Sequence, residues 1–239
     1  MSNKKRYLVI GDIHGRSIYK DIIKKESPDQ VIFLGDFASS HENISPNKQI
    51  AEFDWVIDYK KVHPNTIILR GNHDCEAMGY YWAECYPKAE GYIMWADRKK
   101  IWLDNTQWVY IDEDLKTIFS HAGVSQIWMN DSKIKSVYEI NNLEPSELFG
   151  FIPESSFDTY GDSVTQPPTW IRPQSLCKCN VREWDQVVGH TQVTTDIINI
   201  RKATKENRNI WLCDALSLSK YLLIENGTFI PSSYEGQNQ

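Results

Sequence analysis

Short apolar segments that end in a glycine and then a metal-competent side chain recur along this chain of 239 residues. The segment 66–69 is apolar and partly β-branched, which is typical of a buried strand, and it runs into Arg-Gly-Asn-His-Asp at 70–74. The glycine allows a sharp backbone turn where the strand ends. An amide, an imidazole and a carboxylate then follow one another, which indicates that this strand presents polar groups to a ligand.

Two earlier segments have the same design. Residues 7–10 run into Gly-Asp-Ile-His-Gly at 11–15, and residues 31–34 run into Gly-Asp-Phe at 35–37. A helix is expected between them at 17–25, which makes a βαβ unit with two parallel strands. In open α/β sheets, ligands gather at the carboxyl ends of the strands. We therefore expect the polar groups of these motifs to converge.

Two later segments complete the series. Residues 116–120 lead into His-Ala-Gly at 121–123, and residues 186–188 lead into Gly-His-Thr at 189–191. Four of the six histidines lie in the strand-end motifs, namely His14, His73, His121 and His190. A single buried histidine is usually a hydrogen-bonded core residue, but four at strand ends favour a shared site. We interpret His41 and His63 as ordinary surface residues.

Composition narrows the class of protein. Hydrophobic residues make up 41% and charged residues 24%, as in an ordinary globular protein. No apolar run approaches the roughly 18 residues of a membrane span, and no long apolar signal segment follows the first residues, so we expect a cytoplasmic protein with no membrane partner. Five cysteines without a CxxC pair indicate reduced thiols. The net charge of −6 makes a nucleic acid a less favoured partner, although bound metal ions would still admit a phosphate.

The rest of the chain suggests one domain over residues 1–239. A second helix is expected at 47–61, strands at 108–111, 193–200, 209–213 and 219–224, and an irregular cap or lid at 124–174, where prolines replace periodicity. Within the lid, Arg172 is a candidate substrate-binding residue because an arginine fork suits a phosphate; the alternative is a surface arginine in a loop. The aromatic-rich segment 75–105 is interpreted as helical packing, with a wall of a substrate cleft as the alternative.

The five motifs GDIHG, GDF, GNHD, SHAG and GHT, in this order from Gly11 to Thr191, resemble those of the calcineurin-like metallophosphoesterases. The resemblance implies an α/β (α+β) fold with a four-layer sandwich, in which two mixed β-sheets are flanked by helices and the site lies along one edge. It also implies a binuclear metal-dependent phosphoesterase that hydrolyses phosphate esters with a metal-activated water.

The resemblance assigns roles residue by residue. The metal ligands it implies are Asp12, His14 and Asp36 for the first ion, and Asp36, Asn72, His121 and His190 for the second. Asp36 is then the bridge, and His73 resembles the catalytic histidine, a general acid that protonates the leaving oxygen. Carboxylates with neutral imidazoles suit two divalent ions, of which manganese is expected and Fe, Zn, Ni or Mg are alternatives. Asp74 is expected to cap the helix that follows it.

Two positions depart from the family pattern. In the protein-phosphatase branch the second motif continues with an acidic residue and an arginine, whereas this chain has Ala38-Ser39-Ser40. The group that orients His73 is therefore open, with Asp74 or a lid residue as candidates. Many members place a second histidine two positions after the first in the last motif, where this chain has Gln192. In having no second histidine at this position, the chain resembles the protein-phosphatase and diadenosine-tetraphosphatase branch.

Several functions remain open at this point. The phosphorylated substrate could be a phosphomonoester, for example on a phosphoprotein, or a dinucleoside polyphosphate or another nucleotide. A metal-dependent nuclease or phosphodiesterase is less favoured by the acidic charge. A non-catalytic binding module on the same fold is the alternative outside enzymes, but such a protein should have lost ligands, and this chain keeps all of those implied above.

Overall fold

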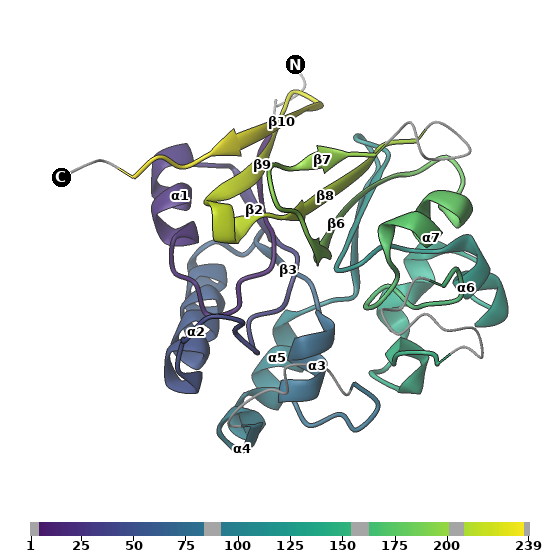
Figure 1. Ribbon diagram of the computed structural model, residues 1–239, viewed down its shortest axis with the longest axis horizontal. Helices are drawn as coiled ribbons and strands as arrows, with labels where there is room; N and C mark the ends of the chain where they lie inside the picture. Colours follow the sequence, from purple (N-terminus) through teal and green to yellow (C-terminus); the bar gives the residue numbers. More distant parts are fainter. Residues whose placement is uncertain (1–4, 84–91, 154–162, 201–207, 237–239) are drawn as a thin grey trace.

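The computed structural model describes residues 5–83, 92–153, 163–200 and 208–236. In these residues the strands form two mixed sheets of five strands each. The first sheet has the order β10-β9-β1-β2-β3 and the second has the order β4-β5-β6-β8-β7. Figure 1 shows the sheets between α1 and α2 on one side and α6 and α7 on the other, which is the expected α/β sandwich.

In the first sheet, β1 (Arg6–Ile10), β2 (Gln30–Phe33) and β3 (Ile67–Ile68) are parallel. The hairpin of β9 (Lys220–Glu225) and β10 (Thr228–Ser233) joins it through an antiparallel β1–β9 pair. In the second sheet, β5 (Thr117–Ser120), β6 (Asp185–Gln192) and β8 (Ile210–Asp214) are parallel. Its outer strands, β4 (Val109–Asp112) and β7 (Ile198–Asn199), run antiparallel to their neighbours.

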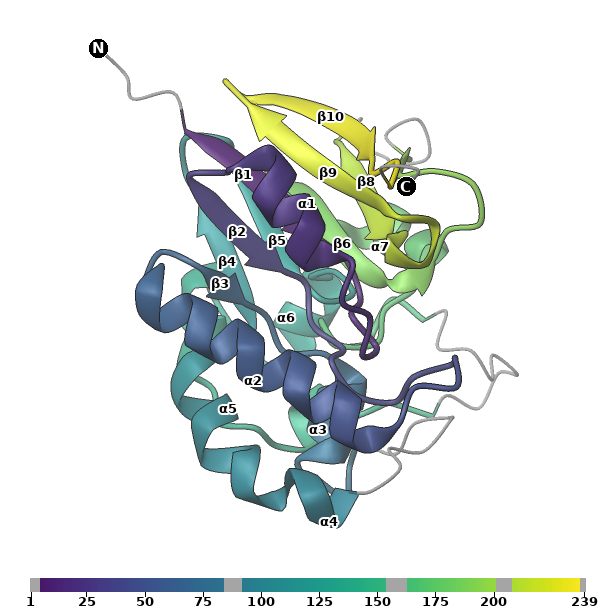
Figure 2. The ribbon, with the colours of Figure 1, turned by 90° about the vertical axis from the view of Figure 1, so that its left-hand side faces the viewer.

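Alternation along the strands divides the core into two clusters. On β1, Leu8 and Ile10 belong to the cluster that contains residues of α1 (Tyr19–Glu26) and α2 (Pro46–Val62). Val9 points to the opposite face, where its cluster includes Phe119 and Val187 of the second sheet. Figure 2 shows α1 and α2 covering the outer face of the first sheet. This pattern stacks the two sheets so that the carboxyl ends of their parallel strands open on the same edge.

The remaining helices follow the site motifs or lie around the second sheet. They are α3 (Asn72–Ala77), α4 (Tyr92–Trp95), α5 (Lys99–Asn105), α6 (Gln126–Asp131) and α7 (Pro173–Cys179), with 3₁₀ turns at Ala96–Arg98, Val137–Asn142, Glu147–Phe149 and Leu216–Leu218. The predicted lid at 124–174 contains α6 and two of these turns, and its residues 154–162 lie outside the described part. Its role as a lid stays a prediction.

The aromatic-rich segment supports the packing interpretation. Trp95 and Trp102 are fully buried in the first core cluster, with Tyr80 and Trp82 packed against it. None of the described residues of this segment lines the cavity at the candidate site. Residues 84–91 lie outside the described part of the chain.

Two strand predictions were wrong in extent. The strand predicted at 193–200 is reduced to Ile198–Asn199, an exposed edge strand, because residues 194–196 form a bend. The last motif does not follow its strand but lies within β6, whose register against β8 shifts between Val188 and Gln192. No helix in the described ranges combines the length and apolar character that crossing a bilayer requires.

Candidate metal centre

The strand-end motifs of both sheets converge on one cavity of about 320 Å³. Asp12 and His14 follow β1, Asp36 follows β2, and Asn72 and His73 begin α3 just after β3. From the second sheet, His121 follows β5 and His190 lies on β6. All seven predicted metal or catalytic residues are brought together, and the parallel arrangement of the strands is the reason.

The first group of potential ligands is Asp12, His14 and Asp36, whose ligand atoms all lie within 4.8 Å of one another. His14 Nε2 is 4.0 Å from a carboxylate oxygen of each aspartate. Its Nδ1 lies 2.8 Å from the carbonyl oxygen of Ala38, which can only accept, so Nδ1 carries the proton and Nε2 keeps its lone pair. Burial lowers the pKa of His14 to about 3, which keeps the ring neutral.

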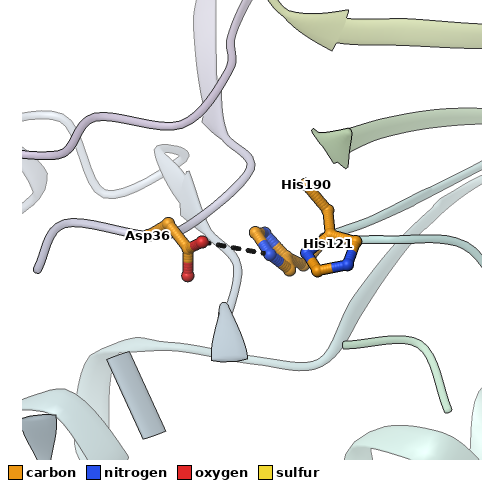
Figure 3. A group of neighbouring side chains, drawn as sticks. All are labelled: Asp36, His121 and His190. Carbon is orange, nitrogen blue, oxygen red and sulfur yellow. Dashed lines mark ion pairs between the residues drawn. The ribbon is translucent and has the colours of Figure 1, made fainter. Parts of the chain in front are cut away.

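The second group is Asp36, His121 and His190, also within 4.8 Å. Figure 3 shows the Asp36 carboxylate facing His121, with His190 beside it. His121 Nε2 lies 3.4 Å from Asp36 Oδ2 and 2.9 Å from Asn72 Oδ1, and His190 Nδ1 lies 3.1 Å from the same amide oxygen. His121 Nδ1 donates to the Leu34 carbonyl oxygen at 2.8 Å, so Nε2 is the nitrogen that faces these oxygens.

Electrostatics shows that this arrangement calls for positive charge. Burial disfavours a charged His121, but the charges of Asp36 and Asp12 raise its pKa to about 10. In the absence of a cation, His121 therefore carries the positive charge itself. Burial raises the pKa of Asp12 well above its usual value, and the nearby Asp214 adds to the effect. The site brings buried acceptor atoms from two sheets close together. Such atoms repel one another when they are unpaired, and a divalent cation between them would remove that repulsion.

Asp36 belongs to both groups and is held from several sides. Its Oδ1 accepts a hydrogen bond from the backbone N–H of His73 at 3.0 Å, while Oδ2 faces His14 and His121. Burial acts against ionisation, but His121 and His73 hold the pKa of Asp36 well below its usual range. Its φ of +50° lies in the left-handed region, as do those of His14 (+45°) and His190 (+59°). Such strain is typical of functional sites, where the surrounding structure maintains it.

Glycine is required where the backbone passes the carboxylates. A Cβ on Gly71 would lie 2.0 Å from Asp36 Oδ1, and a Cβ on Gly189 would lie 2.2 Å from Asp12 Oδ1. Both distances are far below van der Waals contact. The same approach lets the N–H of His190 donate to Asp12 at 3.0 Å.

Asp74 ties the second motif to the third. Its Oδ2 accepts from the N–H groups of Gly71 at 3.1 Å and Asp36 at 3.0 Å, and its Oδ1 accepts from that of Phe37 at 2.7 Å. The bond from Gly71 confirms the predicted cap of α3. The alternative that Asp74 orients His73 is wrong, because its oxygens are used by the backbone, and His73 Nδ1 has no hydrogen-bond partner among the described residues.

The wall of the cavity beyond the metal groups includes Arg16, His41, Trp170, Arg172, Gln192 and Asp214. Arg172 lines the cavity, and its Nη1 donates to the His190 carbonyl oxygen and to Thr191 Oγ1, both at 3.2 Å; its role in substrate binding stays a prediction. His63 is exposed as predicted and stacks on Tyr59.

The interpretation of His41 as an ordinary surface residue was wrong. It is exposed, but its ring contacts those of His14 and His73 and it lines the cavity. Arg16, Trp170 and Asp214 were also missed as cavity residues. Asp214 carried a signal, since it ends the apolar strand β8 with a carboxylate in the manner of the other motifs.

Comparison with known proteins agrees with this geometry. The family model for calcineurin-like phosphoesterases matches residues 5–227, so the chain belongs to that family and is a hydrolase of a metal-dependent class. No curated protein matches the chain.

Among solved structures, a protein serine/threonine phosphatase from Saccharomyces cerevisiae with similarity to human phosphatase PP5 shares 12% identity, with a TM-score of 0.59 over 100% of this chain and 82% of that one. The hypothetical protein PH1004 from Pyrococcus horikoshii OT3 shares 12% identity, with a TM-score of 0.53 over 97% of this chain and 89% of that one. At this identity the similarity supports the fold alone.

Proposed function

We propose that the chain hydrolyses phosphate esters at a centre of two divalent cations. The observation that carries the proposal is the buried cluster around Asp36, in which His14 and His121 each bind a backbone carbonyl oxygen through Nδ1 and turn Nε2 towards carboxylate or amide oxygens.

The proposed ligands follow the two groups. Asp12, His14 and Asp36 hold one ion, and the second ion takes Asp36, Asn72, His121 and His190, with Asp36 shared between them. When bound, two such ions neutralise a phosphate and lower the pKa of a bound water so that it can attack. The mixed oxygen and nitrogen donors suit manganese, with Fe, Zn, Ni or Mg as alternatives.

The protein's own residues then bind the substrate and supply a proton. Arg172 carries a positive charge on the cavity wall, where it attracts phosphoryl oxygens. His73 is the proposed acid for the leaving oxygen. Burial lowers the pKa of His73 in the substrate-free site against the opposing charge of Asp36, and His41, His121 and Arg172 add to the lowering. A phosphate dianion in the cavity supplies the opposite charge, which raises that pKa towards the value an acid needs.

A phosphomonoester, on a protein or on a nucleotide, is the substrate class that the site favours. The cavity of about 320 Å³ lies at the low end of ligand sites and accommodates a phosphoryl group with part of its leaving group. Arg16 and Arg172 on its wall suit a dianion. The net charge of −6 speaks against a nuclease, and a cytoplasmic location is part of the proposal.

The test is turnover of p-nitrophenyl phosphate and of bis-p-nitrophenyl phosphate, with Mn²⁺ and with a chelator, alongside elemental analysis of the loaded protein. We expect Mn-dependent turnover that Asp36→Asn abolishes, because the shared carboxylate loses its charge and places an N–H₂ group towards the site. Asp58→Asn, on the exposed face of α2, is the matched control and should retain full activity.

Two results would contradict the proposal in different ways. Bound metal without turnover of either ester with any divalent ion would favour the non-catalytic binding module. Absence of bound metal after loading would remove the centre itself.

A further inference from the structure

His41 is a further imidazole at the site, besides His14, His73, His121 and His190, and no step described above uses it. Its ring centroid lies 5.0 Å from that of His14 and 6.0 Å from that of His73, and each pair of rings meets edge to face. The rings of His14 and His73 are themselves 5.5 Å apart. His14 and His73 are buried, whereas His41 is exposed and lines the cavity with them.

The loop that carries His41 is fixed against the first motif. Glu42, the next residue, forms an ion pair with Arg16, in which Arg16 Nε lies 2.7 Å from Glu42 Oε1. Arg16 also donates to the carbonyl oxygen of Asp12 at 3.4 Å. The neighbouring Ile44 packs so closely on Gly15 that a Cβ there would lie 2.9 Å from its Cγ2. The contacts of the residues that follow His41 therefore help to set its position at the cavity.

Of residues 38–45, which form the loop that carries it, His41 alone lines the cavity. Ser39 is buried, and its Oγ has no hydrogen-bond partner within the described ranges. Arg172, which also lines the cavity, lies in the segment that precedes α7. His41 lies between β2 of the first sheet and α2, and Arg172 lies between β5 and β6 of the second sheet, so the two side chains reach the cavity from loops of different sheets.

We propose that His41 is a substrate-contacting residue, whose imidazole N–H donates a hydrogen bond to a non-bridging oxygen of the phosphoryl group and favours a phosphomonoester over a diester. The proposal rests on the function proposed above. A monoester carries three non-bridging oxygens and a diester carries two. A donor in addition to Arg172 and the cations therefore contributes more to binding of the monoester than to binding of the diester.

The test compares His41→Ala and His41→Gln with His63→Ala. His63 is the matched control because it is an exposed histidine that stacks on Tyr59 of α2 and does not line the cavity. Truncating an exposed side chain should leave the fold intact. The first measurement is the metal content of each Mn-loaded protein. The second is the dissociation constant of inorganic phosphate from the loaded protein by titration calorimetry. The third is kcat and KM for the mono- and bis-p-nitrophenyl esters.

We expect unchanged metal content in all three variants. Phosphate binding in His41→Ala should weaken about tenfold, as for the loss of one hydrogen bond to a charged group. kcat/KM for the monoester should fall by a similar factor, and kcat/KM for the diester by less than about twofold. His41→Gln, which keeps an N–H donor, should lie between the wild type and His41→Ala, and His63→Ala should match the wild type.

Wild-type phosphate affinity and an unchanged monoester-to-diester ratio in metal-loaded His41→Ala would overturn the proposal. Loss of metal from His41→Ala alone would overturn it too, because His41 would then support the metal groups and not the substrate. A wild-type protein that binds no metal would overturn the proposed function, and this inference with it, so the metal analysis separates the two failures.

Discussion

Replacing Asp74 with asparagine tests how the second and third motifs are joined. The Asp74 carboxylate accepts three backbone hydrogen bonds, from Gly71, Asp36 and Phe37, and it is 1% exposed. The substitution keeps the size of the side chain but exchanges one acceptor oxygen for a donor. It therefore changes the hydrogen bonds and leaves the packing nearly constant.

The magnitude follows from those three bonds. If the amide oxygen replaces Oδ2, the N–H of Phe37 faces an N–H₂ group; if it replaces Oδ1, the N–H groups of Gly71 and Asp36 do. At least one buried N–H is left unpaired, at a cost of about 1–3 kcal/mol, and the remaining bonds lose the added strength of a charged acceptor. Relief of repulsion with Asp36 offsets part of this. We expect a net destabilisation of about 2 kcal/mol, a sizeable share of an ordinary folding free energy.

The assay is urea unfolding of the metal-free protein, followed by tryptophan fluorescence. Burial and the charge of Asp36 raise the pKa of Asp74 to about 7, so the measurement belongs at pH 8, where the carboxylate is ionised. Manganese affinity is measured alongside. Because Asp74 positions the segments that carry Asp36 and Asn72, the affinity should fall about ten- to a hundredfold, as for other groups that support metal ligands.

Asp58→Asn provides the matched control for this prediction. Asp58 pairs with Lys61 on the exposed face of α2, where an ion pair contributes less than about 1 kcal/mol. Stability of Asp74→Asn within about 0.5 kcal/mol of the wild type, with unchanged manganese affinity, would refute the reasoning that this carboxylate joins the two motifs.

Three further predictions concern the acid, the glycine turn and pH. His73→Ala should slow hydrolysis of phenyl phosphate about a hundredfold but that of p-nitrophenyl phosphate much less, since only the poorer leaving group needs the proton; equal losses would argue against the acid role. Gly71→Ala should lower the free energy of unfolding by at least about 2 kcal/mol in urea titrations, because its Cβ would overlap Asp36; stability like that of the wild type would contradict the close approach. Burial raises the pKa of Asp74 to about 7 and that of Asp214 to about 6, so their contribution to stability is complete below pH 4 and is lost as pH rises through 6 to 7. The melting temperature with chelator should therefore fall between pH 6.5 and pH 8, above the range where the lowered pKa values of His14 and His73 act in the opposite direction, and it should recover with Mn²⁺. A rise with pH in that interval would contradict the assignment.

Much of the site could be predicted because its signal is local. An apolar strand, a glycine and a polar side chain stand next to one another in the chain, and the identities of Asp12, Asp36 and His121 at those ends are explicit. The helices predicted at 17–25 and 47–61 were close to the observed Tyr19–Glu26 and Pro46–Val62, since an apolar face and terminal prolines are also local features.

The errors arose where the outcome depends on distant neighbours. Whether residues 193–200 form a strand depends on the partner strand β8, and only Ile198 and Asn199 pair with it as a strand. The last motif lies within β6 because a register shift there accommodates His190 at positive φ, which strand propensity does not encode.

The sequence by itself determined the family of the chain and the set of residues around the proposed cations. The reason is that most of these polar residues stand directly after an apolar strand and a glycine in the sequence. Only the tertiary structure decided what surrounds them. It placed His41 against His73, and it brought Asp214 beside Asp12 across a separation of some two hundred residues. It also placed the Asp74 carboxylate where it accepts hydrogen bonds from the backbone of the second motif. The physical reason is that strand periodicity and turn chemistry act over a few residues, whereas the contacts between one loop and another are set by how the two sheets pack.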